Sequence, residues 1–253
     1  MKITEIYFSP TGGTKKVSEA LSTLLSNEVE SINLTDRNIN LKEIKINSDD
    51  VAVISVPSYG GRVPYNVTQK FRDIKGNGAR AVLVCVYGNR AYEDTLIELM
   101  DTVKESGFKV ISAVSAIAEH SIARQFASGR SDEMDLKKIA EFADEIKNKI
   151  EKNDYKEPEI PGNRPYKKYS SGNMIPKPNK SCDKCRICIR ECPVGAIDND
   201  NPKKVDGDKC ISCMRCISVC PNSARKLNPV ALSAVSIALK AVCSDRKECE
   251  LFI

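Results

Sequence analysis

Residues 182–193 read Cys-Asp-Lys-Cys-Arg-Ile-Cys-Ile-Arg-Glu-Cys-Pro, and residues 210–221 repeat the pattern as Cys-Ile-Ser-Cys-Met-Arg-Cys-Ile-Ser-Val-Cys-Pro. Both runs have the spacing C-x2-C-x2-C-x3-C-P, and the second follows the first by 28 residues. Together they hold eight of the 11 cysteines in a chain of 253 residues. In a reducing compartment, such crowding indicates metal binding rather than disulfide bonds.

The spacing distinguishes two kinds of metal site. A pair of zinc sites is the alternative, since the gap from Cys192 to Cys210 has the length found in zinc ribbons. Zinc needs only two C-x2-C pairs per site, and it would not explain a third regularly spaced cysteine, a fourth before proline, or the duplication. Iron–sulfur clusters explain all three features, so we expect clusters.

Residues 180–227 resemble the bacterial-type ferredoxins that carry two [4Fe–4S] clusters. In that family the fourth cysteine of each run ligates the other cluster. The resemblance assigns Cys182, Cys185, Cys188 and Cys220 to a first cluster, and Cys210, Cys213, Cys216 and Cys192 to a second. Outside the two runs, we expect Cys85 to be a buried apolar side chain, whereas Cys243 and Cys249 match no cluster motif.

The first 155 residues alternate between strand-like and helix-like patterns. Short runs rich in Val, Ile and Ala predict strands at about residues 2–8, 29–34, 51–56, 80–87 and 109–116. Apolar residues recur at helical spacing between these strands, as at Val17, Leu21 and Leu25. The alternation predicts an α/β fold, a doubly wound five-stranded parallel sheet whose ligands bind at the carboxyl ends of the strands.

A turn rich in hydroxyl groups and glycine follows the first predicted strand. It contains Ser9, Thr11, Gly12, Gly13 and Thr14, and a helix follows it. Backbone N–H groups at a helix N-terminus bind phosphate, so the turn predicts a phosphate site, although an ordinary capped turn is the plainer alternative. The Walker A pattern is absent, and the G-x-G-x-x-A match at residues 76–81 precedes a strand, so we expect neither ATP hydrolysis nor nicotinamide binding.

Two further loops fall at predicted carboxyl ends of strands and place tyrosine beside glycine, as flat ligands require. They contribute Ser58, Tyr59, Gly60 and Gly61 after the third strand, and Tyr87, Gly88, Asn89 and Tyr92 after the fourth. His120 follows the fifth strand and could reach the same ligand. A packed surface ring is the alternative for each tyrosine, and a structural role is the alternative for the histidine.

With these loops, residues 1–152 resemble flavodoxin, and Ser9-x-Thr11-Gly12-x-Thr14 matches its phosphate motif. The resemblance implies that FMN is bound by the phosphate turn, with the two later loops flanking the isoalloxazine ring. Pro10 removes one hydroxyl donor that the family often has. The whole chain resembles the fused flavodoxin–ferredoxin proteins of anaerobes, whose cofactors are FMN and two [4Fe–4S] clusters.

Composition divides the chain into four segments. We expect a flavodoxin-like domain at residues 1–155, a proline-rich linker at 156–178, a small α+β ferredoxin domain at 179–228, and a docking helix with a tail at 229–253. The apolar stretch Val230–Val242 spans 13 residues, too few to cross a bilayer. No apolar segment follows the basic start of the chain, so we expect a cytoplasmic location.

The net charge of each half of the chain indicates which kinds of partner to expect. Residues 161–253 carry a net charge of +8, whereas residues 1–160 carry −3. Two clusters of about −2 each would neutralise much of this excess, so we expect no nucleic-acid partner. The sequence predicts an intracellular electron-transfer protein that serves redox partner proteins, in an oligomeric state that includes a dimer as one option. An FMN-dependent reductase and a redox sensor are the alternatives.

Overall fold

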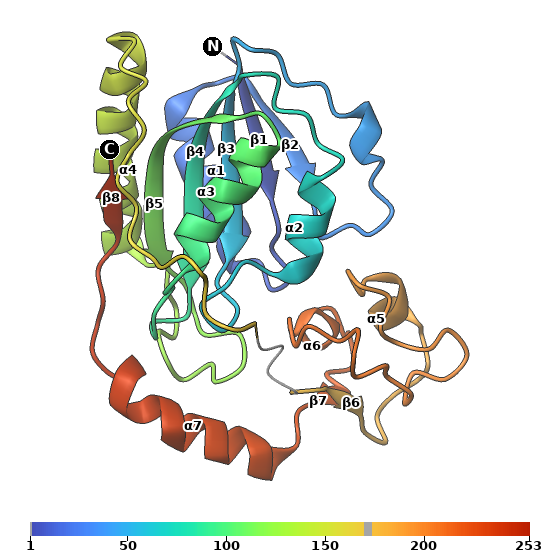
Figure 1. The fold of residues 1–253 in the computed structure, drawn as a ribbon. Helices are drawn as coiled ribbons and strands as arrows, with labels where there is room; N and C mark the ends of the chain where they lie inside the picture. Colours follow the sequence, from blue (N-terminus) through green and yellow to red (C-terminus); the bar gives the residue numbers. More distant parts are fainter. Residues whose placement is uncertain (1, 170–173) are drawn as a thin grey trace.

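The computed structural model describes residues 2–169 and 174–253, and its main feature is a six-stranded sheet (Figure 1). The strands are β1 (Ile3–Tyr7), β2 (Val29–Asn33), β3 (Val51–Pro57), β4 (Arg80–Tyr87), β5 (Lys109–Ile117) and β8 (Glu250–Phe252). Their order is β2-β1-β3-β4-β5-β8, and only β8 runs antiparallel to its neighbour. The predicted doubly wound sheet of five parallel strands is confirmed, with the flavodoxin-like order 2-1-3-4-5.

Helices cover both faces of the sheet, as the apolar strands require. The helices are α1 (Gly13–Leu25) and α4 (Glu133–Glu151) on one face, and α2 (Tyr65–Phe71) and α3 (Thr95–Glu105) on the other. Val17, Leu21 and Leu25 are buried along α1, as their helical spacing predicts. A capping box of Asp132 and Asp135 fixes the start of α4. A short 3-10 helix at Leu41–Glu43 lies between β2 and β3.

The second half of the chain is built from short elements around the cysteine loops. They are β6 (Lys177–Pro178), α5 (Ile187–Arg190), α6 (Arg215–Ser218) and β7 (Arg225–Lys226), with β6 and β7 antiparallel. The sequence repeat is also a repeat of backbone conformation, because Arg186 and Met214 have left-handed φ values of 64° and 60° immediately before α5 and α6. The predicted α+β domain is thereby confirmed.

Part of the predicted linker lies against the flavodoxin-like half. The backbone N–H groups of Asn163 and Lys167 donate to the Asp94 carboxylate at 2.9 and 2.7 Å. The Arg164 guanidinium contacts the Asp101 carboxylate at 2.6 Å. Asp94 is the N-cap residue of α3 and Asp101 lies within it, so this part of the linker runs along α3. Residues 170–173 of the predicted linker lie outside the described residues, and the four domain boundaries stay predictions.

Helix α7 (Pro229–Cys243) leads from the cysteine-rich half back to the sheet, where β8 pairs with β5 (Figure 1). The helix is apolar, yet Val230 and Ile237 are 77% and 76% exposed. Its role in docking the two halves therefore stays a prediction. In the described ranges, every helix is too short or too polar to cross a bilayer.

Candidate redox site

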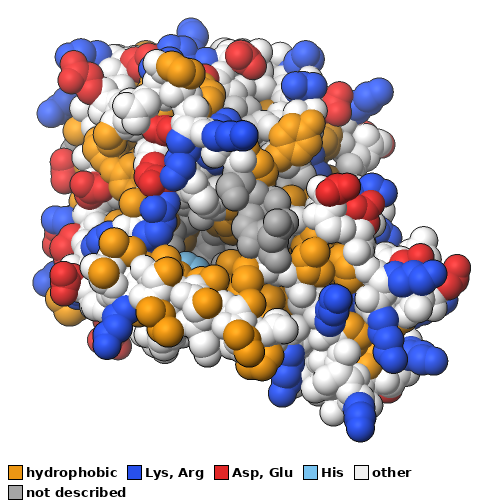
Figure 2. Space-filling view, turned by 60° about the horizontal axis from the view of Figure 1, so that its bottom comes forward, with side chains coloured by type: hydrophobic (Ala, Val, Ile, Leu, Met, Phe, Trp, Pro, Cys, Tyr) orange, Lys and Arg blue, Asp and Glu red, His pale blue; other side chains and the backbone are white. Residues whose placement is uncertain are grey.

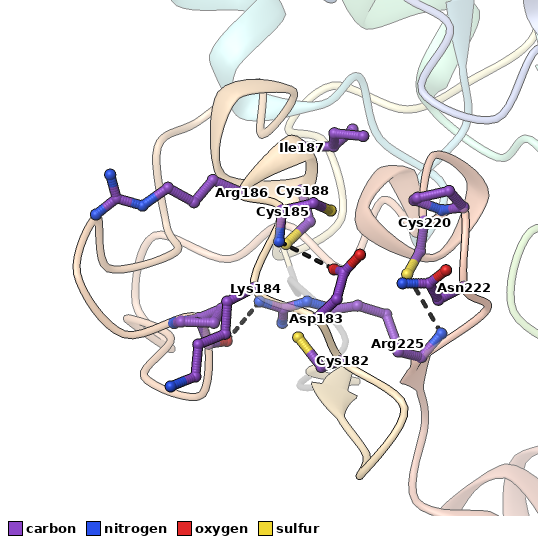
Figure 3. Close-up of a pocket in the computed structure, with 13 residues that line it drawn as sticks. Cys182, Asp183, Lys184, Cys185, Arg186, Ile187, Cys188, Cys220, Asn222 and Arg225 are labelled. Atoms are coloured by element: carbon purple, nitrogen blue, oxygen red, sulfur yellow. Dashed lines mark hydrogen bonds between the residues drawn. The ribbon is translucent and has the colours of Figure 1, made fainter.

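The structure gathers the eight motif cysteines into two pockets. Cys182, Cys185, Cys188 and Cys220 line the first pocket (Figure 3), and Cys192, Cys210, Cys213 and Cys216 line the second. Each pocket thus takes three cysteines from one run and the fourth from the other run, as the resemblance implied. We name them the first and the second cysteine pocket.

A backbone N–H group donates a hydrogen bond to the sulfur of the fourth cysteine in each run. The N–H of Ala196 donates to the Cys192 sulfur at 3.3 Å, and the N–H of Ala224 donates to the Cys220 sulfur at 3.2 Å. Burial acts to raise the pKa of Cys220, but the backbone N–H groups around it outweigh burial and lower that pKa below its usual value. Since thiolates ligate iron, these N–H groups favour the ligating form.

The turn after β1 has the geometry of an anion site. Gly12 adopts a left-handed φ of 96°, and α1 begins with neither a side-chain cap nor an acidic residue in its first turn. The Ser9 hydroxyl accepts the N–H of Lys15 at 2.8 Å, which closes the turn. The N-terminal N–H groups of this 13-residue helix therefore suit the phosphate of FMN.

A cleft of about 890 Å³ lies between the two halves. Its walls are Thr11, Gly13, Glu119, Ser121, Ile122, Arg124, Gly129 and Arg130 on one side, and Met214, Ile217, Ser218, Cys220, Ser223, Arg225, Lys226, Leu227, Pro229 and Leu232 on the other. Figure 2 shows this side of the molecule, where apolar side chains gather below the hollow. The size and the mixed lining are typical of a site for a cofactor such as FMN.

Of the predicted ring-binding residues, Tyr59 lies beside the second cysteine pocket. The loop of Tyr59 is closed by a backbone hydrogen bond of 3.0 Å to Arg62. The ring is partly buried against the same apolar core as Ile211 and Cys213. Burial, and to a smaller extent Cys213, raises the pKa of Tyr59 well above its usual value. This loop therefore brings the flavodoxin-like half against the second cysteine pocket.

The loop after β4 contacts the end of α7 and the tail, defined as residues 244–253, instead of the cleft. The Tyr92 hydroxyl donates to the Glu250 carboxylate at 2.9 Å, and its ring packs edge-on against Tyr87 at 5.3 Å. The Asn89 amide donates to the backbone carbonyls of Cys243 and Asp245, both at 2.8 Å. Tyr87, Asn89 and Tyr92 are not among the residues that line the cleft. A flavin contact for these three side chains therefore stays a prediction.

Asn89 gives a stability prediction. Asn89→Ala removes a 3% exposed amide and leaves two carbonyls without their donor, which should cost about 1–3 kcal/mol of unfolding free energy. Denaturant unfolding should show a lower midpoint than in Asn38→Ala, the control at an exposed asparagine. Equal midpoints for the two variants would contradict a structural role for Asn89.

The remaining predicted residues shape the loops. The His120 Nδ1 accepts the N–H groups of Ile122 and Ala123 at 3.2 and 3.1 Å, and burial lowers the pKa of this neutral ring. A Cβ at Gly88 would lie 2.7 Å from the His120 ring, so only glycine fits there. The Ser58 hydroxyl bonds the Thr95 hydroxyl at 2.7 Å. Left-handed φ values at Gly60 and Gly61 turn the same loop. Thr14 is buried.

Two arginines that lie at the site escaped prediction. The Arg215 guanidinium donates to the carbonyl of Pro10 at 3.2 Å, inside the phosphate turn, and also contacts the Glu191 carboxylate. Arg225 lines both cysteine pockets. The repeat offers a signal for both, because positions 28 residues earlier hold Ile187 and Ile197. Where the second repeat has arginine and the first has isoleucine, the charged side chain indicates a polar contact that the first repeat does not make.

Comparisons with known proteins match the two halves of the chain separately. Residues 181–225 match the family model of the 4Fe-4S dicluster domain. The ferredoxin-like protein YdhX of Escherichia coli K12 is 42% identical over 55 residues, which is 20% of this chain and 25% of that protein. The pyruvate synthase subunit PorD of Methanocaldococcus jannaschii is 42% identical over 48 residues, which is 18% of this chain and 56% of that subunit.

A third relative is a subunit of the ion-translocating oxidoreductase complex of Methanosarcina acetivorans, 38% identical over 47 residues and 18% of each chain. The chain thus spans about half or less of these relatives' lengths. Among solved structures, an archaeal flavodoxin has 16% identity and a TM-score of 0.44, with 60% of this chain and 99% of that one covered. The FMN-bound Fusobacterium nucleatum flavodoxin has 20% identity and a TM-score of 0.42, with 59% and 99% covered.

The sheet order and the matched domain define the class of protein. A flavodoxin-like α/β half is followed by a ferredoxin-type iron–sulfur half. In its architecture, the chain therefore joins a flavodoxin-like α/β fold to a 4Fe-4S dicluster domain.

Proposed function

We propose that this protein transfers electrons between FMN and two [4Fe–4S] clusters, one in each cysteine pocket. One observation carries the proposal: the second cysteine pocket packs against the end of the sheet where the strands have their carboxyl termini, and the phosphate turn lies at this same end. Cys213 shares an apolar core with Tyr59, and Arg215 reaches the Pro10 carbonyl. A cluster in that pocket would therefore lie beside the flavin site.

The residues of the chain divide the work of binding. The N–H groups at the start of α1, with Ser9, Thr11 and Thr14, would hold the phosphate of FMN. Met214, Ile217 and Leu232 supply an apolar wall of the cleft that excludes water. When bound, a flavin accepts one or two electrons, whereas a cluster passes one at a time, so the pair suits carriers of both kinds.

Exposure suggests where an external partner would meet the protein. Cys185 of the first pocket is exposed to solvent, whereas Cys213 of the second is buried against the flavodoxin-like half. Cys220 of the first pocket lines the cleft proposed for the flavin. An external partner would therefore meet the first cluster at Cys185, and both clusters would lie beside the flavin site.

The partners should be redox proteins. One relative belongs to an ion-translocating oxidoreductase complex and another to pyruvate synthase, which supports a redox enzyme as donor or acceptor. The eleven cysteines all lie within the described ranges and form no disulfide there, as suits a reducing location such as the cytoplasm. We propose no nucleic-acid partner.

Quantifying iron and flavin on one anaerobically purified sample tests the proposal. We expect about eight irons per chain and one flavin, together with the visible absorption of both groups. Zinc in place of iron, or four irons at full reconstitution, would contradict the two clusters.

FMN rather than FAD should be released by acid extraction, because the turn offers a site for one phosphate. Thr11→Ala should weaken FMN binding by roughly 0.5–1.5 kcal/mol, or up to about 3 if the hydroxyl donates to ionised phosphate. Fluorescence titration of the flavin-free protein measures the dissociation constant. Thr23→Ala, on an exposed turn of the same helix, is the control and should bind normally. Release of FAD would refute the assignment.

A second function has one observation in its favour. The cleft opens between the halves and is large enough for a cofactor and a small acceptor. In that case the protein would be an FMN-dependent reductase supplied by its clusters. Steady turnover with a quinone or similar acceptor, at rates above those of free FMN, would favour this function over that of a carrier.

A further inference from the structure

A buried arginine breaks the internal repeat, and its role rests on the proposed function. Residues 192–197 read Cys-Pro-Val-Gly-Ala-Ile, and their counterparts 220–225 read Cys-Pro-Asn-Ser-Ala-Arg. Ile197 is 5% exposed in the apolar cluster around the cysteines. Arg225 stands in the equivalent position and is 2% exposed. The second repeat has thus exchanged a buried apolar side chain for a buried positive charge.

Arg225 lies between the two sites, because it lines both the first and the second cysteine pocket. In Figure 3 its side chain extends from β7 along the first pocket. Its Nη1 and Nη2 donate to the carbonyls of Pro176 at 2.8 Å and Pro202 at 2.6 Å. These two bonds fix the plane of the guanidinium. The third donor, Nε, is buried and has no hydrogen-bond partner among the described residues.

A buried charge without a counter-charge is costly, as is a buried donor without an acceptor. Within residues 2–169 and 174–253, no carboxylate forms an ion pair with Arg225. Two neutral carbonyls satisfy donors but do not balance the charge. The groups that would balance it are anionic clusters, each with about −2 when oxidised.

We propose that Arg225 is a shared counter-charge for both clusters and that its Nε donates a hydrogen bond to one of them. Because reduction adds negative charge, a fixed cation and an N–H donor stabilise the reduced state and raise the reduction potential. Arg225 is a positioning and tuning residue that gives the second repeat a property absent from the first.

Arg225→Ile tests the proposal by copying the residue of the first repeat. Lys203→Ile removes the same formal charge from an exposed side chain of the same half that lines neither cysteine pocket nor the cleft, and it is the matched control. Potentials are measured by redox titration followed by EPR, on samples with equal iron content. In Arg225→Ile, at a fixed potential, the reduced-to-oxidised ratio of at least one cluster should fall about tenfold, which is 59 mV for one electron. Lys203→Ile should change this ratio far less.

The outcomes separate two failures. If Arg225→Ile binds about eight irons and keeps both potentials, the inference about Arg225 is wrong while the carrier function stands. If the unsubstituted protein binds no clusters, the proposed function itself fails.

Should Arg225→Ile not assemble clusters, the unsubstituted position can still be tested. Arginine labelled with ¹⁵N only in the guanidinium is incorporated into a variant that carries Arg186→Lys, Arg190→Lys and Arg215→Lys, because these three guanidinium groups also lie at or beside the pockets. Pulsed EPR of the reduced protein should then show coupling between ¹⁵N and a cluster. No such coupling would overturn the hydrogen bond from Arg225.

Discussion

Cys192→Ala should deprive the chain of the second cluster, not of the first. Cys192 follows the first run in sequence but lines the pocket of Cys210, Cys213 and Cys216. A cluster with three ligands is lost or degraded, so the iron content should fall from about eight toward about four. Iron quantification and EPR of the reduced protein measure the loss.

Double variants make the crossed ligation decisive. Adding Cys213→Ala to Cys192→Ala should remove little further iron, since both cysteines line the same pocket. Adding Cys185→Ala should remove the rest, since Cys185 lines the other pocket. Cys220→Ala is the matched control, and it should give the reverse pairing. If Cys192→Ala and Cys185→Ala instead affect the same cluster, each run holds its own cluster and the assignment is wrong.

Electrons should pass between the flavin and the clusters within one chain. The halves are joined covalently and meet at the second cysteine pocket, so one is present near the other at an effective concentration in the millimolar range. Photoreduction of the flavin should therefore reduce the clusters at a rate that does not depend on protein concentration. A rate proportional to concentration would indicate transfer between chains.

Arg215→Ala should slow this internal transfer, because Arg215 joins α6 to the phosphate turn. Loss of a hydrogen bond from a charged donor costs about 1.5–3 kcal/mol, which lowers the docked-to-undocked ratio by roughly tenfold or more. Arg186→Ala is the control, since Arg186 is exposed and forms an ion pair of 3.4 Å with the exposed Asp200. A rate in Arg215→Ala equal to that of the control would show that docking does not limit transfer.

The predictable parts of this protein are those encoded by short-range patterns. Cysteine spacing fixes the loops of both pockets, because three sulfurs must face one cluster within seven residues. Apolar runs fix the central strands, since β3 and β4 are buried on both faces. Both kinds of signal lie within a few neighbouring residues, so one sequence is enough to read them.

The unpredicted parts depend on contacts between distant residues. Strand β8 has three residues and exists because β5 offers a free edge. Nothing near Tyr92 in sequence indicates that Glu250 will accept its hydroxyl, 158 positions away. The bond from Arg215 to Pro10 spans 205 positions. Pattern and propensity carry no information at such separations, and only the assembled tertiary structure brings these groups together.

Strand β8 changes what kind of attachment the iron–sulfur half has. The chain enters that half after the segment along α3 and returns through α7 to the far edge of the sheet (Figure 1). The iron–sulfur half is thus an insertion whose two ends are both attached to the flavodoxin-like half, rather than a domain joined to it by one linker. Attachment at two points leaves the iron–sulfur half mainly one motion, a rotation about the line through those points. It can therefore tilt against the flavin site but cannot diffuse away from it. The geometry would limit the search for a productive encounter to a single arc.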